Sequence, residues 1–273
     1  MKYSVLMSLY YKVDPKFILE SLNSVINQTL KPDEIVIVKD GKLTKKQEDL
    51  LKKLDKENKG LFKFITFKQN MGQGYAYEYT LSKCKNDLVT LMDSDDVCDL
   101  TKNEIEVKYL NEHKEIDMVG SDTYEFNGDI TNIISYRKMP ITHEEIIKFS
   151  KKRCPLVQPT TMFRKDKVLN AGGYKEGRIA EDWDLYIRMI QNGLKLHNID
   201  KPLVYVRVND DFYSRRGGIQ YLKTILEFKK KHYKSGFFSF KDYVISSCAH
   251  IVTCLMPNFV RTFIYKKFLR KKA

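Results

Sequence analysis

Several features that define specialised classes of protein are scarce in this sequence. Its 273 residues contain five cysteines, and none of them forms a Cys-x-x-Cys pair. This odd and scattered set argues against a disulfide framework or a zinc site and favours a reducing, cytoplasmic compartment. No uninterrupted apolar run approaches the ~20 residues that a membrane-spanning helix needs. The first residues lack the apolar core and cleavage site of a signal peptide, so we expect no secretory leader.

Positive charge is concentrated at one end of the chain. Residues 215–273 contain 14 Lys and Arg side chains against two acidic ones, Glu227 and Asp242, so they carry +12 of the net charge of +13. Residues 1–214 are therefore almost neutral. Such an asymmetry points to an anionic surface, either a membrane or a nucleic acid.

Strand and helix patterns alternate through the first third of the chain. Apolar strand patterns at 3–9, 34–39, 62–67 and 88–92 are separated by helical patterns near 15–26, 44–58 and 75–83. This alternation predicts a parallel sheet with right-handed crossovers. Further strands are expected at 118–126, 160–163 and 203–208, with helices at 102–112, after Thr142 and from 181. We expect one α/β domain that spans residues 1–218.

An apolar strand that ends in three carboxylates, at 88–96, is the most informative stretch of the sequence. Asp93 and Asp95 alternate, so an extended backbone would point both side chains the same way. Adjacent carboxylates repel each other unless a cation or a proton relieves them, and Mg²⁺ bridged to phosphates is a common solution. Ligands of open α/β sheets bind just beyond such strand ends. In the alternative interpretation, Asp95 or Asp96 caps a helix that begins near Leu100.

A second acidic group, 181–184, opens another helical pattern. Acidic residues in a first helical turn also interact favourably with the helix dipole, which is a purely structural interpretation. Trp183, the only tryptophan, suits a sugar platform and simple packing equally well. Asp40 and Gly41 follow an apolar strand, so they form a turn and are also candidates for ligand contact.

Residues 219–273 combine helical spacing with basic charge. The apolar stretch 243–264 is interrupted by polar residues and Pro257, and the basic residues that follow it are Lys266, Lys267, Arg270, Lys271 and Lys272. This pattern predicts an amphipathic helical tail that lies on an anionic membrane surface. The alternative is a set of helices that packs on the body of the protein.

Several motifs, in this order and spacing, together resemble a known family. They are residues 4–8, 37–41, 70–72, 92–96, 159–164, 172–174 and 181–182. The chain resembles family 2 glycosyltransferases of the GT-A fold, in the subgroup of amylovoran, capsule and O-antigen synthesis, over about residues 3–218. The resemblance implies a Rossmann-like α/β fold with a mainly parallel central sheet flanked by helices.

The resemblance also implies an activity and a set of site residues. The reaction would be an inverting transfer of a sugar from a nucleotide-sugar, with UDP favoured, to a saccharide hydroxyl. The donor would be bound by Ser8, Tyr10, Asp40, Gly72, Asp93 and Ser94. Asp95, with Asp93, would coordinate Mn²⁺ or Mg²⁺. Asp182 would be the general base, next to Glu181. Trp183 and Asp184 are candidates for acceptor contact, and Asp184 is the reserve candidate for the base.

The basic tail on a neutral body suggests an enzyme on the inner face of the cell membrane that acts on a lipid-linked saccharide. A nucleic-acid-binding protein is an alternative from another class, but phosphates would be repelled by Asp93, Asp95 and Asp182, so we expect no nucleic-acid partner. A nucleotide-sugar-binding module without catalysis is a third possibility. The presence of both Glu181 and Asp182 argues against it.

Overall fold

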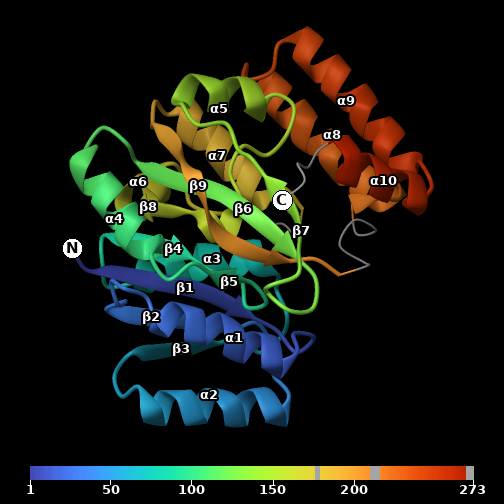
Figure 1. Cartoon of the computed structure of the whole chain (residues 1–273). Coiled ribbons are helices and arrows are strands. Elements are labelled where there is room, and N and C mark those ends of the chain that lie inside the picture. Colours follow the sequence, from blue (N-terminus) through green and yellow to red (C-terminus); the bar gives the residue numbers. More distant parts are fainter. Residues whose placement is uncertain (176–178, 210–215, 269–273) are drawn as a thin grey trace.

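One mixed β-sheet forms the centre of the molecule, and helices lie on both of its faces (Figure 1). The computed structural model describes residues 1–175, 179–209 and 216–268. The strands are β1 (Tyr3–Leu9), β2 (Glu34–Lys39), β3 (Phe62–Thr66), β4 (Leu88–Leu91), β5 (Val97–Cys98), β6 (Met118–Phe126), β7 (Ile133–Arg137), β8 (Met162–Arg164) and β9 (Leu196–Arg207). The α-helices are α1 (Pro15–Ile26), α2 (Lys45–Glu57), α3 (Gln73–Thr80), α4 (Lys102–Glu112), α5 (His143–Ser150), α6 (Lys165–Asn170), α7 (Glu181–Gln191), α8 (Ile219–Lys234), α9 (Phe240–Leu255) and α10 (Asn258–Phe268).

The first half of the sheet is parallel, as the sequence predicts. β3, β2, β1 and β4 lie side by side in that order, and each neighbouring pair is parallel. Alternate residues of these strands point to opposite faces. Val5 therefore packs with residues of α1 and α2, whereas Leu6 packs with residues of α3. Because the strands are parallel, their carboxyl ends meet at one edge of the sheet.

The second half of the sheet is mixed. β8 lies antiparallel between β4 and β6, and β9 runs parallel to β6. β9 begins at Leu196, earlier than the strand predicted at 203–208. Asp200 and Lys201 interrupt the apolar pattern there, but they lie in a bulge, because Ser121 of β6 pairs with Ile199 and the next residue pairs with Pro202. A polar bulge is difficult to distinguish from a loop in sequence.

The last three helices, α8, α9 and α10, form a group beside the sheet (Figure 1). α8 packs on α7 through a buried cluster of Trp183 and Ile187 from α7, Phe228 from α8 and Phe238 from the turn that follows. α9 lies along α8. The C-terminal segment is therefore docked on the body through α8.

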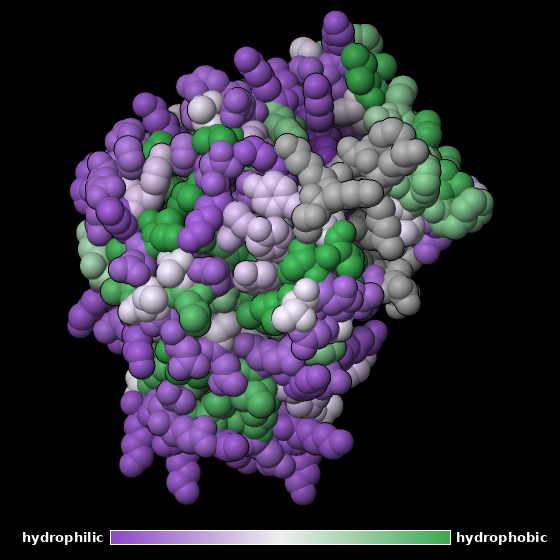
Figure 2. All heavy atoms as spheres, in the orientation of Figure 1, coloured by the Kyte–Doolittle hydropathy of each residue, from purple (hydrophilic) through white to green (hydrophobic). Residues whose placement is uncertain are grey.

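α9 and α10 present apolar side chains to the outside (Figure 2). The exposed large apolar residues on these helices are Phe240, Val244, Ile245, Ile251, Val252, Leu255, Phe259 and Phe263. Phe259 is 77% exposed. None of the helices in the described ranges has both the length and the apolar character needed to cross a bilayer.

Asp184 joins α7 to α8 through a cluster of charged groups. Its carboxylate accepts hydrogen bonds from Arg188 Nε at 2.8 Å and Lys231 Nζ at 2.5 Å, and it lies 2.9 Å from His232 Nε2. Burial alone would raise the pKa of Asp184, but the hydrogen bonds from His232, Lys231 and Arg188 outweigh burial and hold that pKa well below its usual range. The charge of Asp184 therefore stabilises the α7–α8 junction.

We expect Asp184→Asn to destabilise the fold, because it leaves the buried side chain of His232 and two cations without their anion. The expected loss is about 3 kcal/mol, or roughly 6–12 °C in Tm. Since the folded-state pKa of Asp184 is depressed, the stabilisation is present above the ordinary Asp pKa of ~3.9 and is lost as the pH falls below it. Thermal denaturation at pH 7 measures the effect. The matched control is Asp166→Asn on the exposed face of α6, and an equal loss in both variants would contradict the expectation.

Candidate active site

A cleft of about 620 Å³ opens where β1, β2 and β4 end, and its opposite side is formed by the start of α7 together with residues of α8 and α9. Most of the residues predicted from the sequence line it. They are Ser8, Tyr10, Asp40, Gly72, Asp93, Ser94, Asp95, Glu181, Asp182 and Trp183. The fold thus gathers side chains that are far apart in the chain around one space.

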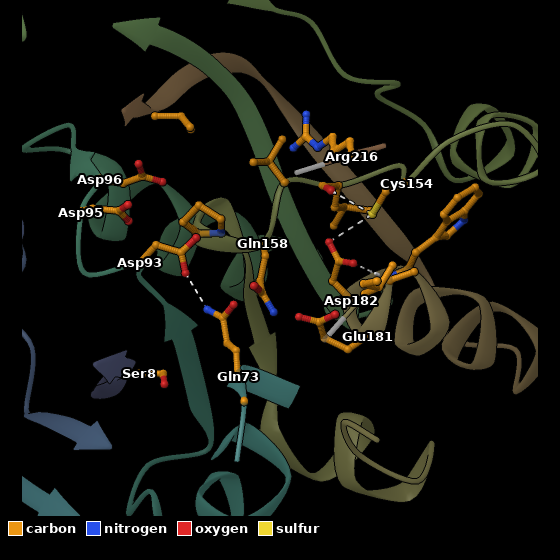
Figure 3. A pocket seen from close by; sticks show the side chains of 18 of the residues that line it. Ser8, Gln73, Asp93, Asp95, Asp96, Cys154, Gln158, Glu181, Asp182 and Arg216 are labelled. Carbon is orange, nitrogen blue, oxygen red and sulfur yellow. Dashed lines mark hydrogen bonds between the residues drawn. The ribbon is translucent and has the colours of Figure 1, made fainter. Parts of the chain in front are cut away.

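The acidic turn after β4, residues 93–96, forms one wall of the cleft (Figure 3). Gln73 Nε2 donates a hydrogen bond to Asp93 Oδ1 at 2.7 Å. Arg207, at the end of β9, donates its backbone N–H to Asp96 Oδ1 at 2.8 Å and its Nε–H to the carbonyl of Asp95 at 2.9 Å. These bonds fix the path of the turn beside the cleft.

The interpretation of Asp95 or Asp96 as a helix cap is wrong. α4 begins at Lys102, its cap position is Thr101, and the Thr101 side chain makes no capping hydrogen bond. Asp99 Oδ1 accepts the backbone N–H of Thr101 at 2.9 Å instead. Asp95 and Asp96 line the cleft.

The acidic turn concentrates negative charge in a buried position. Burial, followed by the charge of Asp95, raises the pKa of Asp93 to about 7. Burial and the charges of Asp95 and Asp93 also raise the pKa of Asp96 well above its usual range. A cation beside the turn would relieve this repulsion.

Carboxylate oxygens are hard ligands that suit Mg²⁺ or Mn²⁺, so Asp93 and Asp95 fit a divalent ion. In the part of the chain that the structure describes, no three His, Cys, Asp or Glu side chains form a group that could hold a metal ion. An ion at Asp93 and Asp95 would therefore take further oxygen ligands from elsewhere, such as a bound diphosphate.

Asp40 holds a second turn at the edge of the cleft. Its carboxylate accepts hydrogen bonds from the backbone N–H groups of Met71 at 2.7 Å and Gly72 at 3.0 Å, and from Asn70 Nδ2 at 2.8 Å. Gly41 adopts φ +89°, and a Cβ there would lie 2.9 Å from the backbone nitrogen of Asn70. Only glycine permits the two turns to approach this closely. Together they form the end of the cleft that Ser8 and Tyr10 also line.

The start of α7 forms the opposite wall, where Glu181 and Asp182 face the acidic turn (Figure 3). The preceding residue, Ala180, has φ 62° and ψ 23°, and it is the only non-glycine residue with positive φ in the described ranges. Such strain at a cleft is typical of functional sites. Asp182 Oδ1 accepts the N–H of Trp183 at 2.7 Å, and Cys154 Sγ lies 3.3 Å from Oδ2 as a donor.

Both carboxyl groups on this wall are stronger bases than free side chains. Burial, followed by the charge of Asp182, raises the pKa of Glu181 to about 8. Burial also raises the pKa of Asp182, although hydrogen bonds from Trp183 and Cys154 and the charge of Arg137 oppose the shift. At neutral pH, Glu181 therefore keeps its proton.

Two predicted acceptor contacts have structural roles. Trp183 lines the cleft but is only 4% exposed. Its indole N–H donates to the Ser150 carbonyl at 2.9 Å, and its ring packs on Phe228 with the centroids 4.7 Å apart. Asp184 does not line the cleft. Its carboxylate is held by the α7–α8 charge cluster, so the structure does not bring it to the site.

Sequence reasoning missed several residues of the cleft. Gln73 binds Asp93, and its place in the turn at 70–74 offered a signal. Cys154 contacts Asp182 but carries no motif, because 28 residues separate the two. Arg153 and Arg216 also line the cleft. Their positions depend on how α5 and α8 pack, which local sequence does not specify.

Comparison with known proteins identifies relatives of this chain. A family model described as "Glycosyl transferase family 2" matches residues 4–172. The chain is 35% identical over 271 residues to an uncharacterized glycosyltransferase of Haemophilus influenzae, covering 99% of this chain and 100% of that protein. It is 33% identical to the Escherichia coli UDP-Gal:alpha-D-GlcNAc-diphosphoundecaprenol beta-1,3-galactosyltransferase, covering 99% and 97%. It is 30% identical to the amylovoran biosynthesis glycosyltransferase AmsE of Erwinia amylovora, covering 97% and 98%.

Two solved structures share the fold. S. aureus TarS (residues 1–349) in complex with UDP-GlcNAc aligns with a TM-score of 0.64 at 18% identity, over 98% of this chain and 73% of that one. The Pyrobaculum calidifontis mannosyltransferase PcManGT, in complex with GDP-Man and Mn²⁺, aligns with a TM-score of 0.67 at 12% identity, over 96% and 72%. The α/β GT-A architecture expected from the sequence motifs is confirmed.

Proposed function

Because the chain belongs to glycosyl transferase family 2, we propose that it transfers a sugar from a nucleotide-sugar to a hydroxyl of a saccharide acceptor, with inversion at the anomeric carbon, in surface polysaccharide synthesis. The observation that carries the proposal is the pair of opposed acidic walls, with Asp93 and Asp95 on one and Glu181 and Asp182 on the other (Figure 3). Inversion needs the acceptor to attack from the side opposite the leaving group. Asp182 lies across the cleft from the wall proposed to bind the diphosphate, so a base there meets that need.

The donor end of the proposed site is the edge formed by β1, β2 and β4. Ser8, Tyr10 and the Asp40 turn would receive the nucleoside, and the acidic turn would lie beside the diphosphate. Asp95, with Asp93, would hold Mn²⁺ or Mg²⁺, which supplies positive charge to the departing diphosphate when bound. We favour a UDP-sugar, since the name of the E. coli relative specifies UDP-Gal and the TarS structure contains UDP-GlcNAc.

Asp182 is the proposed general base. It would accept the proton of the attacking hydroxyl as the glycosidic bond forms. The Trp183 N–H and the Cys154 thiol each bind one of its oxygens and fix its orientation. Burial makes its carboxylate a stronger base than that of a free Asp. Glu181, protonated at neutral pH, adds no second negative charge beside it.

The acceptor of the proposed reaction is a lipid-linked saccharide, and the protein would act at the cytoplasmic face of the membrane. The name of the E. coli relative specifies a diphosphoundecaprenol-linked sugar. The exposed apolar side chains of α9 and α10 would enter the interface, and exposed basic residues of 219–273, such as Lys223, Lys230 and Lys234, would face anionic headgroups. Of the basic residues in 219–273, Arg270, Lys271 and Lys272 lie outside the described residues.

The donor site is tested by thermal denaturation with UDP, GDP and their sugar conjugates, with and without Mn²⁺. We expect one nucleotide family to raise Tm in a manner that requires Mn²⁺, because a ligand at 100 times its Kd stabilises the native state by about 2.7 kcal/mol. Asp95→Ala should abolish the metal-dependent part, whereas Asp166→Ala on α6 should retain it. No shift with any nucleotide, or a full shift in Asp95→Ala, would refute the donor site.

The base is tested by comparing Asp182→Asn with Glu181→Gln. We expect Asp182→Asn to lower kcat by ~10²–10⁴-fold while the nucleotide-dependent rise in Tm is kept. Glu181→Gln should cost much less at pH 7, because Glu181 is already neutral there. In the wild type, kcat/KM should fall as the pH drops through the raised pKa of Asp182. Turnover that survives Asp182→Asn would instead favour another base or a binding module.

The membrane surface is tested by flotation with vesicles that contain phosphatidylglycerol. The double variant Phe259→Ser/Phe263→Ser should lose binding by at least tenfold, because burying each Phe contributes about 1.5–3 kcal/mol. Leu100→Ser, which removes a 55% exposed apolar side chain outside the C-terminal helices, is the control. These point substitutions are cleaner than deleting 219–273, which would uncover Trp183 and Ile187. If the wild type, the double variant and Leu100→Ser floated with the vesicles equally, the interfacial role would be contradicted.

A further inference from the structure

The cleft is lined by basic side chains as well as by its two acidic walls. The acidic turn lies at the donor end, whereas Arg153, Arg216 and His250 line the end beside α8 and α9. Figure 3 shows Arg216 on the same side of the cleft as Cys154 and Asp182, away from the acidic turn. Arg216, and Arg153 as the neighbour of Cys154 in the chain, thus line the side of the cleft that holds the proposed base.

A buried lysine and a histidine lie behind this end of the cleft. Lys229 of α8 is fully buried, donates a hydrogen bond to the Ser246 carbonyl and lies 2.9 Å from His250 Nδ1. Burial and the charges of Lys229 and Arg153 lower the pKa of His250 to about 4. His250 is therefore neutral at pH 7, and burial lowers the pKa of Lys229 to about 7. The lasting positive charge here is that of Arg153, which favours an anion in the adjoining space.

The backbone that carries Arg216 is fixed by the last two helices. Gly218 N–H donates to the Cys254 carbonyl at 3.0 Å. The guanidinium of Arg261 lies directly against Gly217, where a Cβ would come within 2.1 Å of it. Arg261 is itself held by the Thr253 and Met256 carbonyls at 2.8 and 2.9 Å. The side chain of Arg216 thus extends from a segment anchored to α9 and α10.

We propose that Arg153 and Arg216 form a subsite for the diphosphate of a lipid-diphosphate-linked saccharide acceptor. This inference rests on the proposed function and adds the acceptor group that the cleft binds. A neutral saccharide needs no guanidinium groups, whereas phosphates pair with them in bidentate geometry. The donor diphosphate is assigned to the opposite wall. From the arginine end, a lipid chain would run toward α8–α10, whose outer faces carry the exposed apolar side chains.

The test is isothermal titration calorimetry of the full chain with farnesyl diphosphate, in EDTA so that no metal can recruit it to the acidic turn. Farnesol provides the lipid without phosphate, and inorganic diphosphate provides the phosphate without lipid. We expect farnesyl diphosphate to bind most tightly. Arg153→Gln and Arg216→Gln should each weaken it by about 10- to 100-fold, since each removes a charge-assisted hydrogen-bonding group.

Lys152→Gln is the matched control, because it removes the same charge from an exposed position next to Arg153 that does not line the cleft. The control should bind like the wild type, and circular dichroism melts should show that all variants fold. Equal weakening by Lys152→Gln would mean non-specific attraction and would overturn the subsite. If the wild type bound farnesol as tightly as farnesyl diphosphate, the subsite would also be overturned.

A second titration, of UDP with Mn²⁺, separates the acceptor subsite from the donor site. The arginine variants should bind UDP like the wild type. If the arginine variants lose affinity for UDP by the same factor as for farnesyl diphosphate, the arginines serve the donor and the subsite is refuted. If the wild type binds farnesyl diphosphate through both arginines but binds no nucleotide, the proposed glycosyl transfer fails while the lipid-diphosphate site stands.

Discussion

The crowding of negative charge in a partly buried cleft is the constraint on which the rest of the structure depends. Asp93, Asp95 and Asp96 cannot all be ionised beside one another at low cost. Hydrogen bonds from Gln73 and Arg207 to the acidic turn offset part of this electrostatic cost, and Arg207 reaches the turn from the end of β9. β9 must therefore run the full length of β6, and its bulge adjusts the register that brings Arg207 into place.

The same constraint explains why the two acidic walls differ. The acidic turn is held mainly by backbone and amide groups, which leaves its carboxylates able to attract a metal ion. Asp182 has the charge of Arg137 nearby and a thiol on one oxygen, so its pKa is raised only in part. Glu181 has only a hydrogen bond from its own backbone to oppose the shift, and burial with the charge of Asp182 outweighs it and raises the pKa to about 8. One cleft can thus favour a cation on one side and a single free base on the other.

The parts of the fold that follow from local chemistry could be predicted from sequence. Apolar runs predicted the bounds of β1, β2 and β6. The helix expected after Thr142 is α5, which begins with a capping box between Thr142 and Glu145. Motif order placed Asp40, Asp93 and Asp182 around one cleft. The role of Asp184 could not be predicted, because its partners Lys231 and His232 lie almost 50 residues away on α8. An acidic residue in a first helical turn looks the same in sequence whether it faces a substrate or a neighbouring helix.

The C-terminal helices are both a wall of the cleft and an outer surface. Tyr221, Ile225 and His250 line the cleft from α8 and α9, while the far sides of α9 and α10 carry exposed apolar residues. Their attachment to the body depends on the Trp183–Phe228 packing and on Asp184. The proposed acceptor side of the cleft is accordingly built in part from the segment that carries almost all of the net charge.

The contact between Gly217 and Arg261 joins the segment before α8 to α10. The guanidinium fills the space where any side chain at 217 would begin, and three carbonyls of the α9 C-terminus, those of Thr253, Cys254 and Met256, hold it there. A larger residue at 217 would displace this guanidinium, and the displaced side chain would forfeit those three bonds. The missing side chain at 217 therefore lets the C-terminal end of α9 and α10 hold the segment that carries Arg216.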